Sequence, residues 1–175
     1  MDDEEPQFLE VGDGMRRRRV AYRFADAGMG EGVALLWLPG FLSDMASTKA
    51  VALSGFAAAH GLGMLRFDYS GHGLSPGDLL GASIGDWLEE ASALLDRLGE
   101  RRTIVVGSSM GGWIALLLAR KLAQEGSLQR LAGLVLIAPA RVSASAISTA
   151  ACSLPAGIEA RHDLQYGHFG HALRS

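Results

Sequence analysis

The sequence predicts an α/β fold, with a mainly parallel sheet flanked by helices and preceded by an N-terminal hairpin. Three observations carry this prediction. Apolar runs without polar alternation recur along the chain, as in strands that are covered on both faces. Segments with apolar residues at helical spacing separate these runs, and glycine or proline marks the ends of both kinds of segment. Over 175 residues this alternation indicates βαβ units in one domain.

Two short apolar segments, at residues 7–11 and 20–24, predict the hairpin, with a tight turn at Gly12-Asp13-Gly14 between them. Four consecutive arginines, 16–19, stand at the start of the second strand. One interpretation makes them a docking patch for an anionic partner. Because the whole chain is acidic, we favour the other interpretation, in which they form the solvated end of an edge strand.

The parallel strands are expected near residues 33–38, 64–68, 103–107 and 132–138, with helices at about 47–60, 84–98 and 113–124. We expect the hairpin at one edge of the sheet and strand 132–138 at the other. An exposed apolar edge strand is a template for further pairing. Self-association through that edge is therefore also expected.

Charge and composition exclude several classes of function. The formal net charge is −3, from 16 Lys and Arg against 19 Asp and Glu, so the chain lacks the basic field that binds nucleic acid. The single cysteine, Cys152, rules out an internal disulfide framework and a multi-thiolate metal site. The longest strongly apolar stretch, 113–119, is far shorter than the ~18 residues of a membrane span. Because the first residues are acidic where a leader would be basic, we expect a cytoplasmic protein.

The strongest functional signal is Gly107-Ser108-Ser109-Met110-Gly111, which lies between a β-branched strand and an apolar helix. A G-x-S-x-G motif in this context predicts a nucleophile elbow, a turn so sharp that only small residues fit two positions either side of the serine. The amides at the start of the following helix favour negative charge beside the serine hydroxyl. We therefore predict Ser109 as a nucleophile. The alternative is a turn that only lets strand and helix pack closely.

A second functional segment, Leu38-Pro39-Gly40-Phe41, ends the first parallel strand. Acyl transfer passes through a tetrahedral oxyanion, and each backbone N–H aimed at it contributes about 3–4 kcal/mol to the stability of the transition state. We predict that the N–H groups of Phe41 and Met110 form this oxyanion hole. The alternative here is a plain Pro-Gly turn.

Asp68 and His72 occupy the glycine-rich segment that follows the second parallel strand. In this architecture the catalytic groups occur along the chain in the order serine, acid, histidine. Both residues precede Ser109, so we interpret them as residues that order the loop. The catalytic acid and base are left unassigned.

Three segments, at residues 40–50, 66–71 and 106–113, resemble those of the α/β-hydrolase superfamily. Within it they look like the group of small hydrolases that comprises palmitoyl-protein thioesterase, also called mycophenolic acid acyl-glucuronide esterase, and its bacterial relatives. The resemblance covers residues 8–140. It implies an α/β-hydrolase fold and Ser109 as nucleophile, with Phe41 and Met110 as oxyanion donors. It also implies hydrolysis of small esters or thioesters, or of an acylated protein, without a cofactor.

Residues 1–140 are therefore expected to form the hydrolase core, and residues 141–175 an atypical tail rich in alanine and serine. The tail contains Asp163, but His162 precedes this acid and His168 and His171 follow it closely. The resemblance implies further strands, an acid and a histidine that this tail does not match. A truncated or frame-shifted product after Ala140 is the expectation.

Two functions follow from these observations. The first is a serine hydrolase that cleaves esters or thioesters through an acyl-Ser109 intermediate. The second is a catalytically incomplete remnant without turnover. A dinucleotide-binding protein is excluded, because the glycines of residues 28–32 precede a strand and lack the G-x-G-x-x-G spacing.

Overall fold

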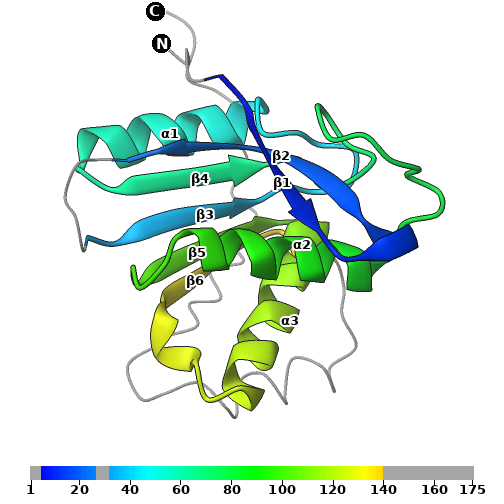
Figure 1. Cartoon of the computed structure of the whole chain (residues 1–175). Coiled ribbons are helices and arrows are strands. Elements are labelled where there is room, and N and C mark those ends of the chain that lie inside the picture. Colours follow the sequence, from blue (N-terminus) through cyan, green and yellow to red (C-terminus); the bar gives the residue numbers. More distant parts are fainter. Residues whose placement is uncertain (1–4, 27–31, 140–175) are drawn as a thin grey trace, which may run out of the picture.

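The computed structural model describes residues 5–26 and 32–139. This part of the chain forms a six-stranded sheet with the order β1-β2-β4-β3-β5-β6 (Figure 1). The strands are β1 (Gln7–Val11), β2 (Arg18–Ala25), β3 (Ala34–Leu38), β4 (Gly63–Phe67), β5 (Thr103–Ser108) and β6 (Leu131–Ile137). The α-helices are α1 (Thr48–Ala59), α2 (Ile84–Arg97) and α3 (Met110–Gln124), and short 3-10 turns cover Gly14–Arg16 and Leu128–Arg130.

The strand pairing confirms the predicted parallel sheet and the strands predicted at its two edges. Strands β4, β3, β5 and β6 are parallel neighbours, while β1 and β2 pair antiparallel and β2 continues antiparallel onto β4. The hairpin therefore forms one edge and β6 the other. Among the described residues β6 pairs with β5 alone, and Val135 and Leu136 are exposed on it. Self-association through this edge stays a prediction.

The helices lie on both faces of the sheet, with α1 on one side and α2 and α3 on the other (Figure 1). The larger hydrophobic core lies on the side of α2 and α3, and the smaller one packs around Trp37, Ala50 and Met64 on the side of α1. All five residues of β3 and all five of β4 are buried. Burial on both faces explains why β3 reads as an unbroken apolar run and why β4 is apolar apart from Arg66.

Two boundaries differ from the sequence-based expectation. The hairpin connection is longer than a tight turn, because the 3-10 turn Gly14–Arg16 follows Gly12, which has φ 79°. Helix α3 begins at Met110, three residues before the predicted start. Glycine is a poor helix former, so the two glycines after Met110 hid the true start of this helix. The predicted tail, residues 141–175, lies outside the described residues.

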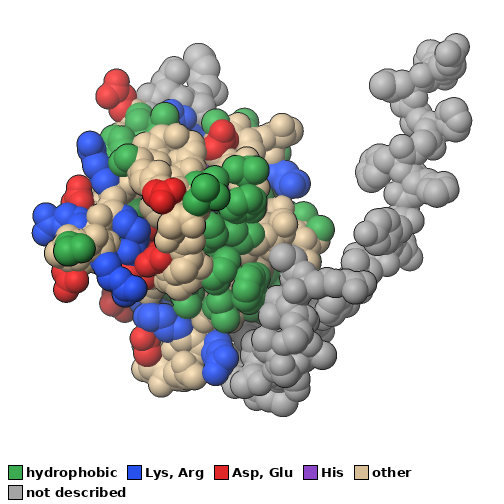
Figure 2. Space-filling view, turned by 90° about the vertical axis from the view of Figure 1, so that its right-hand side faces the viewer, with side chains coloured by type: hydrophobic (Ala, Val, Ile, Leu, Met, Phe, Trp, Pro, Cys, Tyr) green, Lys and Arg blue, Asp and Glu red, His purple; other side chains and the backbone are tan. Residues whose placement is uncertain are grey.

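The parallel strands end together on one side of the molecule, on the right in Figure 1. Figure 2 views the protein from this side and shows hydrophobic side chains gathered across the middle of the face. Phe41, Leu42 and Leu74, on the loops that follow β3 and β4, are all more than half exposed. In open α/β sheets ligands bind outside the carboxyl ends of the strands, so a binding site is expected on this face.

Candidate active site

Ser109 occupies the predicted sharp turn between β5 and α3. Its backbone has φ 52° and ψ −115°, a conformation that costs a non-glycine residue about 1–3 kcal/mol and persists only where the surroundings enforce it. The Ser109 N–H donates to the Ile137 carbonyl (3.0 Å), and the Ser109 carbonyl accepts from the N–H groups of Gly112 (3.0 Å) and Trp113 (3.3 Å). The residue is exposed. The structure thus has an exposed serine in a sharp strand–helix turn, and the role of this turn as a nucleophile elbow stays a prediction.

Three glycines around Ser109 allow strand, turn and helix to approach this closely. A Cβ atom on Gly107 would lie 2.4 Å from the Gly111 carbonyl oxygen. On Gly111 it would lie 2.0 Å from the Leu38 carbonyl oxygen, and on Gly112 it would lie 2.9 Å from the Pro139 Cβ. The glycines therefore do more than relieve the turn itself. They bring the first turn of α3 against the end of β3, where the loop containing Phe41 begins.

The loop that follows β3 passes directly over the elbow. A Cβ atom on Gly40 would lie 3.4 Å from the Ser109 Cβ. The Ser43 N–H donates to the Gly40 carbonyl (3.1 Å), which closes a turn in which Leu42 adopts φ 57°. Among the described residues neither the Phe41 nor the Met110 N–H has a hydrogen-bond partner. Ser109, Phe41 and Met110 are thus brought to one place, and the role of the two amides as an oxyanion hole stays a prediction.

Asp68 and His72 order the loops beside this site. The buried Asp68 carboxylate accepts from the Met45 N–H (2.6 Å) and the Leu74 N–H (2.7 Å), and so joins two loops. The His72 Nδ1 donates to the Ser70 carbonyl (3.3 Å), because a carbonyl oxygen only accepts. The His72 ring packs edge-on against Phe41, with the ring centroids 5.7 Å apart. These contacts agree with a loop-ordering role for both residues.

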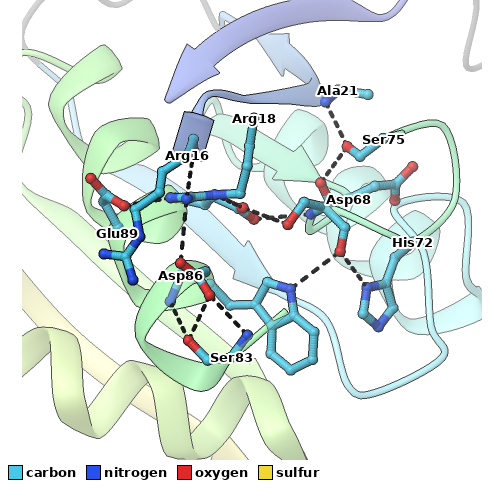
Figure 3. A network of polar contacts seen from close by, with 12 residues as sticks. Arg16, Arg18, Ala21, Asp68, His72, Ser75, Ser83, Asp86 and Glu89 are labelled. Atoms are coloured by element: carbon cyan, nitrogen blue, oxygen red, sulfur yellow. Dashed lines mark hydrogen bonds and ion pairs between the residues drawn. The ribbon is translucent and has the colours of Figure 1, made fainter. Parts of the chain in front are cut away.

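A buried ion-pair network behind the site was not foreseen (Figure 3). Glu90 of α2 is fully buried and accepts from the Ser70 N–H (3.0 Å), the Ser70 hydroxyl (2.6 Å) and the Arg18 Nε (2.8 Å). The Arg18 guanidinium also contacts Asp86 (3.3 Å) and Glu89. The Ser70 carbonyl accepts from the Trp87 Nε1 (3.2 Å). The network therefore joins the hairpin and α2 to the loop that carries His72.

The interpretation of arginines 16–19 as a solvated strand end is wrong for Arg18, whose side chain is only 14% exposed. It pairs with carboxylates about seventy residues away along the chain, which no local pattern reveals. The burial of Glu90, in contrast, could have been inferred from the sequence pattern of α2. Helical spacing places it on the same face as Trp87, Ala91 and Leu94, which form the apolar side of α2. A charged residue on such a face is buried only when it is paired.

Asp68 and Glu90 are expected to contribute less to the free energy of unfolding as the pH rises above about 4. Burial raises the pKa of both carboxyls above their ordinary values, and their hydrogen bonds only partly oppose it. The folded chain then keeps protons that the unfolded chain has already released. This stabilisation is lost as the pH rises through the raised pKa values. Urea unfolding at a series of pH values should show a shallower decline for Glu90→Gln than for the wild type.

Asp86 provides a contrast of opposite sign for the same experiment. The Ser83 hydroxyl lowers the pKa of the Asp86 carboxyl below its ordinary value. Its stabilising contribution is therefore present above about pH 4 and is lost as the pH falls further. Asp86→Asn should alter the pH profile of stability only on that acid side. An identical profile for Glu90→Gln and the wild type would contradict the role of Glu90.

The rest of a catalytic apparatus is not seen in the described part of the chain. Within residues 5–26 and 32–139, no histidine or carboxylate hydrogen-bonds to the Ser109 hydroxyl. The residues of the tail that were weighed as acid or base, Asp163, His162, His168 and His171, lie outside the described residues. In the described part there is also no cluster of three or more potential metal ligands. No helix found there is long and apolar enough to cross a membrane.

Comparison with known proteins gives four informative likenesses. The profile of the family described as serine aminopeptidase, S33, matches residues 34–159. The mitochondrial palmitoyl-protein thioesterase ABHD10 of Rattus norvegicus is 42% identical over 87 residues, which are 50% of this chain and 29% of that protein. The solved structure of a protein from Agrobacterium vitis S4, proposed to be a hydrolase, has a TM-score of 0.72 and 44% identity over 78% of this chain and 52% of the other.

A second solved structure, the alpha/beta hydrolase domain-containing protein 10 from mouse, has a TM-score of 0.66 and 32% identity. That match covers 87% of this chain and 55% of the mouse chain. The matched part thus spans under a third of the curated relative and about half of each solved structure.

Proposed function

Because the chain belongs to the serine aminopeptidase, S33, family of hydrolases, we propose that it is a serine hydrolase that cleaves carboxylic esters or thioesters through an acyl-Ser109 intermediate. Its sheet has the α/β-hydrolase fold of the solved relatives, as expected. The observation that carries the proposal is the strained backbone of Ser109 at the head of α3. Relatives named as thioesterases support the class of substrate, a small acyl ester or thioester or an acylated protein.

In the proposed reaction the Ser109 Oγ attacks the carbonyl carbon of the substrate, and the carbonyl oxygen becomes an oxyanion. The free N–H groups of Phe41 and Met110 would stabilise this charge, which develops only in the transition state. Collapse of the intermediate expels the alcohol or thiol and leaves the acyl group on Ser109. Water then attacks the acyl-serine and releases the acid. The serine proton needs a base, which the described residues do not supply.

The alternative, a remnant without turnover, is favoured by one observation, the lack of a hydrogen-bonded base for Ser109 in the described residues. An oxyanion hole and substrate binding alone can leave a residual acceleration of about 10³–10⁴ over water. The two functions therefore differ in the rate of turnover and not in the geometry of the elbow. The cytoplasmic setting stays a prediction, since the curated relative is named as mitochondrial.

A serine-reactive fluorophosphonate probe and a p-nitrophenyl short-chain ester test the proposal. We expect the probe to label Ser109, and Ser109→Ala to remove both the labelling and the hydrolysis of the ester. Ser108→Ala is the matched control, because its buried side chain lies next to Ser109 in the sequence. Equal hydrolysis by the wild type and Ser109→Ala would exclude Ser109 as the nucleophile. Absence of both labelling and hydrolysis in the wild type would favour the remnant.

A further inference from the structure

The backbone of one residue in the loop after β3, Met45, is held on both sides by charged side chains. The Met45 N–H donates to the Asp68 Oδ1 (2.6 Å), and the Met45 carbonyl accepts from the Arg66 Nη1 (2.8 Å). All three residues are at most 3% exposed. Arg66 and Asp68 are two residues apart at the end of β4, so their side chains leave the strand on the same face. Met45 is thereby fixed to the strand next to β3.

The segment from Gly40, which packs against Ser109, to Met45 is strained. The turn at Gly40–Ser43 holds Leu42 at φ 57°, a conformation that favours glycine. Such a conformation persists only where the surrounding structure enforces it, and here both ends of the segment are held. One end is Gly40, which packs against Ser109. The other end is Met45, whose backbone is held by Asp68 and Arg66. Phe41, whose N–H is the proposed oxyanion donor, lies between these two ends.

Asp68 also fixes the neighbouring loop. Its Oδ2 accepts from the Leu74 N–H (2.7 Å), and its backbone carbonyl accepts from the Ser75 hydroxyl (2.6 Å), which in turn accepts from the Ala21 N–H (2.7 Å) (Figure 3). A Cβ atom on Gly73 would lie 2.1 Å from the Asp68 carboxylate. The Asp68 carboxylate is therefore packed closely against Gly73. Asp68 links the loop after β4 both to Met45 and, through Ser75, to β2.

We propose that Asp68 and Arg66 are positioning residues of the oxyanion hole. They clamp the backbone N–H and carbonyl groups of Met45, and this clamp holds the Phe41 N–H over Ser109. This inference rests on the proposed function, since it assigns the means by which one donor of the hydrolase site is set in place. An oxyanion donor acts on negative charge that is absent from the bound substrate and develops on the way to the tetrahedral intermediate. Displacement of the donor therefore lowers kcat and leaves KM unchanged.

The test compares Asp68→Asn and Arg66→Lys with the wild type in hydrolysis of a p-nitrophenyl short-chain ester. The amide introduced by Asp68→Asn has only one oxygen to share between the Met45 and Leu74 N–H groups. We expect kcat to fall on the order of 10- to 100-fold in Asp68→Asn at constant KM, and by less in Arg66→Lys, which keeps the charge. Asp78→Asn is the matched control, because Asp78 accepts one exposed backbone N–H, that of Leu80 (3.0 Å), and should retain the wild-type kcat.

A folded Asp68→Asn variant with wild-type kcat, or with a loss confined to KM, would overturn the proposal. If circular dichroism shows that this variant does not fold, Arg66→Lys decides by the same criteria. If the wild type itself neither hydrolyses the ester nor reacts with the fluorophosphonate probe, the proposed function fails. In that case NMR tests whether Asp68 and Arg66 position the Phe41 amide. The Phe41 amide resonance should shift in the clamp variants and not in Asp78→Asn, and an unchanged resonance would refute the clamp.

Discussion

Gly111→Ala is expected to lower the free energy of unfolding by about 3 kcal/mol. The added Cβ would lie 2.0 Å from the Leu38 carbonyl oxygen and 2.5 Å from the Pro39 carbonyl oxygen. Both obstacles are backbone atoms at the end of a central strand, so neither can rotate away as a side chain would. Helix α3 must then move off β3. A loss of this size should lower the Tm by roughly 6–12 °C in a domain of this length.

Gly55→Ala is the matched control for this prediction. Gly55 lies inside α1, is exposed, and has open space where its Cβ would be. Since alanine is the better helix former, this change should raise the free energy of unfolding by about 0.5–1 kcal/mol. Thermal and urea unfolding should therefore show a lower stability for Gly111→Ala and a higher stability for Gly55→Ala than for the wild type. Equal stability of Gly111→Ala and the wild type would mean that α3 does not sit this close to β3.

Arg18→Ala is expected to cost about 3–5 kcal/mol at neutral pH, because it leaves the fully buried Glu90 without its charged partner. Burial already raises the pKa of Glu90, and loss of the guanidinium raises it further. The carboxyl can then escape the penalty by binding a proton. The cost of the substitution should therefore be smaller at pH 5 than at pH 8, as measured by urea unfolding at both values.

Two further variants separate this buried pair from ordinary surface charges. In a Glu90→Gln background Arg18→Ala should cost only about 1 kcal/mol, the contribution of its more exposed pairs with Asp86 and Glu89. Arg19→Ala, one residue along the hairpin, removes an exposed cation that lies 3.8 Å from the centre of the Phe8 ring and should cost about 0.5–1 kcal/mol. A penalty for Arg18→Ala no larger than that for Arg19→Ala would contradict the network.

These two predictions concern different supports of the same site. Gly111 lets the first turn of α3, with Met110, reach the end of β3. Arg18 and Glu90 hold Ser70, whose carbonyl accepts from both Trp87 and His72. The rings of His72 and Trp87 in turn contact Phe41. The position of Ser109 and of the two amides thus depends on the adjacent Gly111 and also on Arg18 and Glu90, which are remote in the sequence.

The sequence by itself determined the parallel strands, the two edges of the sheet and the sharp turn at Ser109. These features depend on patterns within a few residues: a buried strand needs a continuous apolar run, and a sharp turn needs small residues at fixed offsets. The same locality explains why the start of α3 was predicted three residues too late. Glycines that lower helix propensity concealed the first turn of α3, although the close approach to β3 requires them there.

Only the tertiary structure decided which loops meet and which charges are buried. The partner of Arg18 is 72 residues away, and Met45 is held by side chains 21 and 23 residues further along the chain. Such pairs form when the hairpin docks on α2 and when β4 inserts between β2 and β3. Helical spacing places Glu90 on the apolar face of α2, but its burial depends on the partner that packing supplies, and no local pattern identifies Arg18 as that partner. The serine could therefore be found from a short motif, whereas the clamp and the network that support its surroundings could not.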